Sequence, residues 1–160
     1  MRVAAGFLDA ESIPRVRFEL ARETLPRGSF GAHFDGVIDT GFVGFVSMPM
    51  QRAFPLELAL AGYSYVRLAD GSTAEKLTCT GYVRIGDRCE AVTVILEPRS
   101  DEVLIGVALL RALQLALLVT RDEVLLLDQE SIDAFRPMDG QGLCVRDSVV
   151  PEVYGARQPS

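Results

Sequence analysis

The chain has 160 residues, a formal net charge of −6 and an apolar content of 49%. This length fits one domain, because soluble domains typically run to about 100–150 residues. The 16 Lys and Arg residues are dispersed, whereas nucleic-acid-binding proteins usually carry a basic stripe, so nucleic acid is disfavoured as a partner. No apolar run reaches the roughly 18 residues that a membrane-spanning helix needs, so we expect no membrane partner either.

The cysteines and the N-terminus indicate the cellular compartment. Cys79, Cys89 and Cys144 are an odd, scattered set without CxxC spacing, which predicts neither a disulfide framework nor a metal site. The N-terminus reaches Asp9 before any signal-type hydrophobic segment develops. A cytoplasmic location is therefore predicted, and no metal or cofactor is expected.

Short apolar segments separated by turn residues dominate the first two-thirds of the chain, which favours an all-β sandwich or barrel. Residues 15–22 alternate charged and apolar side chains, so they are expected to form a strand with one solvent-exposed face. A helical turn is expected over residues 49–53, and one convincing Leu- and Ala-rich helix over residues 107–113. The predicted strands cover residues 3–8, 15–22, 34–38, 63–68, 78–85, 91–96, 103–105, 115–119 and 124–127.

From Asp128 onward the strand pattern fades into a stretch rich in Pro and Gly. The expected organisation is one domain over residues 1–128 and a loosely ordered C-terminal tail over residues 129–160. Residues 42–48 are too apolar to be expected on the surface, and the two glycines among them favour close packing against another backbone.

The sharpest motif is Val37-Ile38-Asp39-Thr40-Gly41, an acid, a hydroxyl and a glycine at the end of an apolar strand. A polar turn there favours a functional carboxylate, although a solvated acid in an Asx turn is the alternative. A second motif, Leu104-Ile105-Gly106, directly precedes the predicted helix. On its own, that segment is typical of an ordinary core strand.

Together these segments resemble the retropepsin-like aspartic proteases, and in particular the short bacterial and archaeal members of clan AA. The resemblance spans roughly residues 6–128 and implies an all-β fold with one short helix, a closed, barrel-like acid-protease domain. The matching segments occur in the family's order: Asp39-Thr40-Gly41-Phe42, Pro49, Ala69-Asp70-Gly71 and Leu104-Ile105-Gly106.

The resemblance implies that Asp39 is catalytic and that Thr40, Gly41 and Phe42 complete its loop. Gly41 would let its N–H approach the carboxylate, and the Thr40 hydroxyl would tie two such loops together. The segment Leu104 to Gly106 would support the loop from beneath. No second Asp-(Ser/Thr)-Gly occurs, so the other carboxylate must come from a second copy of the chain in a twofold dimer.

The same resemblance implies that a hairpin flap closes over a peptide or protein substrate, with Ala69, Asp70 and Gly71 at its turn. A plain β-turn explains these three residues equally well. Phe42 replaces the small residue common in viral and pepsin-like enzymes, and the flap lacks the viral glycine-rich sequence. The implied function is a homodimeric aspartic endopeptidase. The alternatives are a catalytically silent dimer that binds or assembles proteins, and a monomeric β-domain with an accidental Asp-Thr-Gly.

Overall fold

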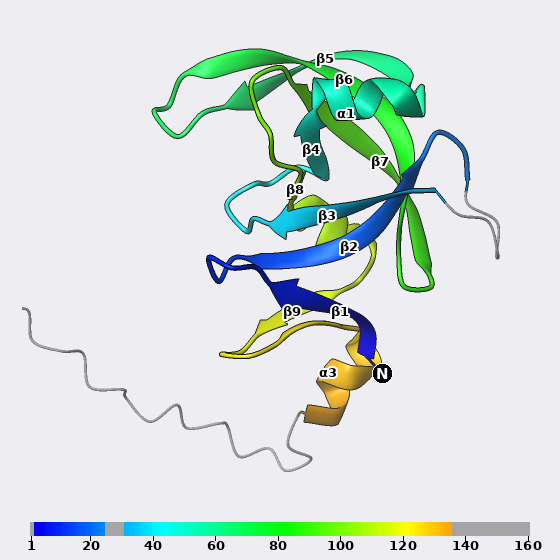
Figure 1. Ribbon diagram of the computed structural model, residues 1–160, viewed down its shortest axis with the longest axis vertical. Helices are drawn as coiled ribbons and strands as arrows, with labels where there is room; N and C mark the ends of the chain where they lie inside the picture. Colours follow the sequence, from blue (N-terminus) through cyan, green and yellow to red (C-terminus); the bar gives the residue numbers. More distant parts are fainter. Residues whose placement is uncertain (1, 25–30, 136–160) are drawn as a thin grey trace, which may run out of the picture.

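The computed structural model describes residues 2–24 and 31–135 as a β-rich domain (Figure 1). Its short helical elements are α1 (Met50–Ala53), the 3-10 turn η1 (Phe54–Leu56), α2 (Val107–Ala112) and α3 (Gln129–Phe135). The strands are β1 (Arg2–Leu8), β2 (Pro14–Ala21), β3 (Ala32–Ile38), β4 (Val46–Pro49), β5 (Ala59–Arg67), β6 (Thr73–Ile85), β7 (Arg88–Glu97), β8 (Leu104–Ile105), β9 (Ala116–Val119) and β10 (Val124–Leu127).

All ten strands belong to one sheet, in the order β5-β6-β7-β4-β8-β3-β2-β1-β10-β9. An additional antiparallel pairing between β2 and β6 curls the sheet back on itself. The sheet does not form a closed barrel, because β5 and β9 remain at its two ends. The prediction of an all-β, barrel-like domain is thus confirmed, but the barrel is not closed as expected.

The core fills the inside of this curled sheet. Apolar residues at alternate positions of β2, β6 and β7 point inward, as the period of two in a strand requires. Helix α2 covers the sheet with Leu109 and Leu110. The largest fully buried side chains are Phe18, Leu20, Met48, Ile85, Ile105, Leu109 and Leu126.

The expected helical turn over residues 49–53 is present as α1, whereas the 3-10 turn η1 and helix α3 were not expected. Two further expectations need correction. Val43 was expected to be buried but is 81% exposed, since the loop after β3 turns it outward. Glu19 was expected on the solvent-exposed face of its strand but is only 9% exposed, because the β2–β6 pairing covers it.

The predicted tail begins with ordered structure, since its first seven residues form helix α3. Asp128 caps this helix by accepting hydrogen bonds from the Ser131 backbone N–H at 2.9 Å and from its hydroxyl at 2.7 Å. Residues 136–160 and Cys144 lie outside the described residues, so the domain boundary stays a prediction. Among the described residues, no helix has both the length and the apolar character to cross a bilayer.

Candidate active site

Asp39 lies directly after β3, at the start of a loop that runs to Phe45 and leads into β4. Strand β8 is inserted between the strands on either side of this loop. It pairs in parallel with β3, through Val37 and Ile38, and antiparallel with β4. The two sequence motifs are therefore neighbours in the sheet, although their paired residues Val37 and Leu104 are 67 positions apart in the chain.

Backbone hydrogen bonds fix the loop to β8 and to the start of α2. The Asp39 N–H donates to the Ile105 carbonyl at 3.0 Å, and the Gly106 N–H donates to the Phe45 carbonyl at 3.0 Å. The Val107 N–H donates to the Phe42 carbonyl at 2.9 Å. Because both ends and the middle of the loop are bonded, the backbone holds Asp39 in a defined place.

Gly106 allows this close approach. A Cβ at that position would lie 2.6 Å from the Phe42 carbonyl oxygen and closer still to that of Gly44, both backbone atoms that cannot yield easily. A glycine is therefore required by packing rather than by an unusual backbone angle. This contact supplies a physical reason for the predicted supporting role of Leu104, Ile105 and Gly106.

The Asp39 carboxylate is half-buried, and its Oδ1 accepts a hydrogen bond from the Gly41 N–H at 2.9 Å. Thr40 and Gly41 are exposed in the single chain, whereas Phe42 is partly buried and its ring packs near Gly44. The loop thus presents a carboxylate and a hydroxyl at the surface of a rigid backbone frame. Thr40 makes no described hydrogen bond through its hydroxyl.

The predicted flap is the hairpin of β5 and β6, paired from Ala59–Thr80 to Arg67–Thr73. At its tip the Asp70 Oδ1 accepts hydrogen bonds from the Ser72 N–H at 2.9 Å and the Ser72 hydroxyl at 2.6 Å. These bonds lower the pKa of Asp70, because they stabilise the carboxylate form. Gly71 has φ +84°, a left-handed backbone that favours glycine. The turn chemistry of this segment is confirmed, and its role as a flap stays a prediction.

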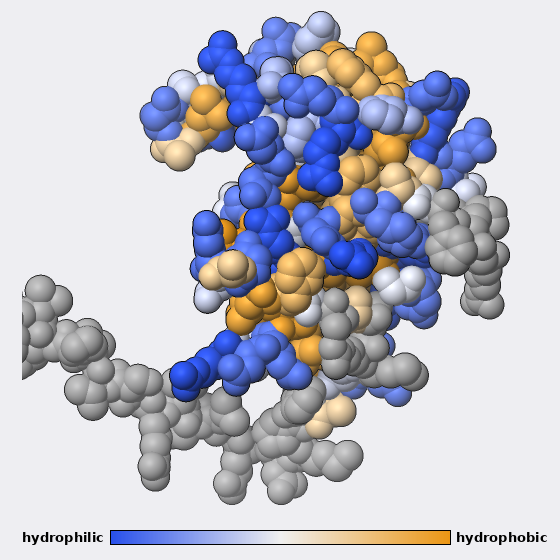
Figure 2. Space-filling view, in the orientation of Figure 1, coloured by the Kyte–Doolittle hydropathy of each residue, from blue (hydrophilic) through white to orange (hydrophobic). Residues whose placement is uncertain are grey.

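The hairpin tip and the Asp39 loop project on the same side of the molecule. In Figure 1 the arm of β5 and β6 extends over the side on which the loop after β3 emerges. Figure 2 shows the surface hollowed between this arm and the body below it. The outer strand β5 has no buried residue, and Tyr63 and Tyr65 are 70% and 74% exposed.

One ion-pair network beside the loop was missed in the sequence. Arg15 on β2 donates to Asp9 at 2.6 Å and forms two bonds to Glu102, at 2.9 and 3.1 Å. It thereby joins the β1–β2 turn to the residue before Val103, whose carbonyl accepts from the Val37 N–H. The sequence separation of 87 positions between Arg15 and Glu102 leaves no local signal for this pair.

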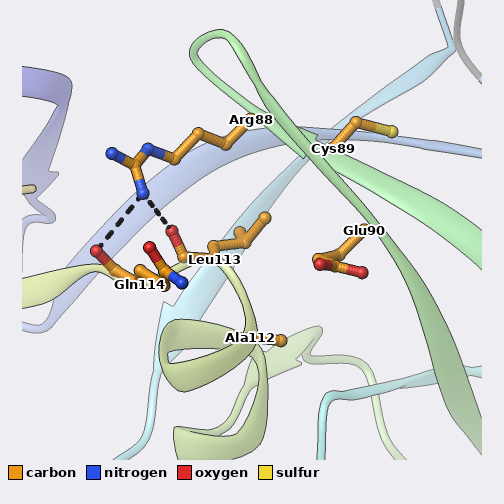
Figure 3. Close-up of a pocket in the computed structure, with 6 residues that line it drawn as sticks. All are labelled: Arg88, Cys89, Glu90, Ala112, Leu113 and Gln114. Atoms are coloured by element: carbon orange, nitrogen blue, oxygen red, sulfur yellow. Dashed lines mark hydrogen bonds between the residues drawn. The ribbon is translucent and has the colours of Figure 1, made fainter.

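A hollow of about 230 Å³ lies at the opposite end of helix α2 from the Asp39 loop. Figure 3 shows Arg88 donating across it to the carbonyls of Leu113 and Gln114, at 2.7 and 3.5 Å. A cation at a helix C-terminus satisfies carbonyls that lack partners within the helix. Arg88 therefore has a structural role, and this hollow is separate from the candidate active site.

The comparisons with known proteins bear on the fold. No protein-family model matches the chain, and no curated protein matches it in sequence. A crystal structure of a retropepsin-like aspartic protease from Rickettsia conorii matches with a TM-score of 0.55 and 15% identity, over 76% of this chain and 87% of that one. A Legionella pneumophila protein of unknown function matches more weakly, with a TM-score of 0.32 and 12% identity over 69% of this chain and 84% of that one.

The chain has a retropepsin-like fold. At 15% identity the likeness extends to the arrangement of strands and no further. The retropepsin-like fold predicted from Asp39-Thr40-Gly41 and Leu104-Ile105-Gly106 is confirmed. The fold alone does not determine the chemistry of the site, which depends on the site's own residues.

Proposed function

We propose that this protein is a homodimeric aspartic endopeptidase in which Asp39 of each subunit contributes one catalytic carboxylate. The observation that carries the proposal is the placement of Asp39. It follows a core strand, on a loop bonded at three points to β8 and α2, within a retropepsin-like fold. The hairpin of β5 and β6 overhangs the same side and supplies the closing element (Figure 1).

The proposed mechanism needs two carboxylates around one water molecule. Two carboxylates that lie close together share a single proton, since both cannot ionise at once. The ionised Asp39 removes a proton from the water, which attacks the scissile carbonyl carbon, while the protonated Asp39 donates to the carbonyl oxygen. The Gly41 N–H, already bonded to Asp39 Oδ1, orients the carboxylate for this exchange.

In this proposal a second subunit supplies the second catalytic carboxylate and the second Asp-Thr-Gly loop. The described residues contain one Asp-Thr-Gly loop, and its Thr40 side chain is exposed. Facing loops around a twofold axis would bury both Thr40 hydroxyls, which then need hydrogen-bond partners from the opposite loop. The partners of this protein are accordingly a second copy of itself and a peptide or protein substrate.

The test is cleavage of an unfolded protein, such as reduced casein, by the wild type and by Asp39→Asn at mildly acid pH. We expect the variant to lose more than about a thousandfold of the activity while it keeps its dimer in sedimentation analysis. Asp122→Asn, in the exposed β9–β10 turn, is the matched control and should keep full activity. A wild-type dimer that cleaves nothing across mildly acid pH would contradict the peptidase and favour a silent binding module.

A further inference from the structure

A second polar site lies on β2 and β3, beside helix α1 and apart from the Asp39 loop. It is a hollow of about 260 Å³ to which β2, β3 and α1 all contribute. A smaller hollow of about 150 Å³ adjoins it and shares Arg17 and His33. The larger hollow is lined by Arg17, His33, Phe34, Asp35 and Arg52.

Asp35 carries the one carboxylate that lines the larger hollow, and it already forms an ion pair with Arg17. Arg17 donates from Nε to one Asp35 oxygen at 2.8 Å and from Nη2 to the other at 3.0 Å. This bidentate pair lowers the pKa of Asp35 and keeps it ionised, with a smaller contribution from the charge of Arg52. Asp35 therefore holds Arg17 in place through two hydrogen bonds and forms none with Arg52.

Among the arginines that line the two hollows, Arg52 has the fewest hydrogen-bond and ion-pair partners. Its guanidinium stacks on the Phe34 ring, 5.0 Å from the ring centroid, and Phe34 in turn packs on Phe18 with ring centroids 5.8 Å apart. Within residues 2–24 and 31–135, Arg52 forms no ion pair and no hydrogen bond with a side chain. The Phe34 ring contacts one side of this exposed guanidinium, and its N–H donors remain available at the wall of the hollow.

The neighbouring charges leave a positive balance. Arg84 pairs with Glu19, and the His33 Nε2 lies 3.6 Å from the other Glu19 oxygen. The three guanidiniums of Arg17, Arg52 and Arg84 thus face the two carboxylates of Asp35 and Glu19 across the two adjoining hollows. This excess is local, since the whole chain carries a net charge of −6.

We propose that this hollow binds a phosphate group, either as free phosphate or as the monoester of a small metabolite. Side chains with N–H donors line it from three elements, Arg17 on β2, His33 on β3 and Arg52 on α1, and donors on several sides suit a tetrahedral oxyanion better than a planar carboxylate. The hollow is smaller than the roughly 300–1,000 Å³ of sites for larger ligands, in keeping with a small anion. This proposal does not depend on the peptidase activity.

His33, the only histidine, gives a direct reporter, because its ring resonances are unique in the NMR spectrum of the full chain. We expect a saturable shift of these resonances when inorganic phosphate is added to tens of millimolar at constant pH and ionic strength. Glycerol phosphate is titrated in parallel. Tighter binding of the monoester identifies an organic phosphate, and tighter binding of the inorganic ion identifies free phosphate; both outcomes support the site.

Arg52→Gln should weaken phosphate binding about tenfold, because it removes the guanidinium group whose N–H donors would bind the phosphate oxygens. The matched control Arg121→Gln removes the same charge from the distant β9–β10 turn and should leave binding unchanged. Arg52→Lys, which keeps the charge, should bind with intermediate strength if Arg52→Gln proves unstable. No saturable shift with either phosphate, equal weakening in Arg52→Gln and Arg121→Gln, or equally tight binding of acetate would each overturn the proposal.

Discussion

The Asp39 loop and the β5–β6 hairpin face the same side of the molecule but are built differently. The loop is bonded through its backbone to β8 and α2, and a side chain at Gly106 would collide with it. The outer part of the hairpin pairs only within itself, and β5 has no buried residue. The backbone bonds therefore hold the Asp39 loop in place, whereas few contacts restrain the overhanging arm.

The largest effect is expected where the loop is packed most tightly. Gly106→Ala should lower the free energy of unfolding by about 3 kcal/mol, because the added Cβ meets the Phe42 and Gly44 carbonyls. Urea denaturation of the purified variant measures this loss. A loss below about 1 kcal/mol would show that the loop can shift, and the contrast with the hairpin would fail.

The next prediction concerns the exposed hydroxyl of the loop. Thr40→Val should leave the stability of the single subunit unchanged, because Thr40 is exposed there and its hydroxyl makes no described bond. It should raise the dimer dissociation constant about tenfold, since each lost interfacial hydrogen bond leaves a partner unsatisfied. Analytical ultracentrifugation measures the constant, with Ser72→Ala in the hairpin turn as the control. Equal dimer affinities in the two variants would argue against a loop-to-loop interface.

A smaller effect is expected at the hairpin tip. At Gly71→Ala no atom lies within 4 Å of the added Cβ, so only the left-handed backbone angle of +84° is penalised. The expected loss is about 1 kcal/mol, well below that of Gly106→Ala. Hydrogen exchange should locate the change at the hairpin turn alone. Faster exchange in β8 as well would show that the arm and the loop are coupled.

The smallest effect is expected from the network that borders the loop. Arg15 lowers the pKa of Asp9 and of Glu102, so both carboxylates stabilise the fold above their ordinary pKa of about 4 and lose that contribution as the pH falls through their lowered values. In Arg15→Gln the unfolding free energy should therefore fall less steeply below about pH 4. Urea titrations over that range measure the slope, and Arg121→Gln should keep the wild-type slope.

The sequence predicted the local positions of the Asp39 loop and of the hairpin turn better than the strand bounds around them. The positions of Asp39 and of the Ala69 to Ser72 turn follow from local chemistry, namely a polar turn at the end of an apolar strand and the Asp-Gly preference of tight turns. The strand bounds differ most at β5, which begins at Ala59 rather than at residue 63, and at β6, which begins at Thr73 rather than at residue 78. In β6 the added residues 73–77 pair with β5 through backbone bonds, which need no alternation of apolar side chains.

The chain by itself determined which segments become strands and where the Asp-Thr-Gly loop falls, because alternation and turn residues act over a few positions. Only the tertiary structure decided that β8 lies between β3 and β4, that Glu19 is covered, and that Arg15 reaches Glu102. Those outcomes depend on strand order and register, which are selected by the pairing and packing of the whole sheet and are encoded by no short segment.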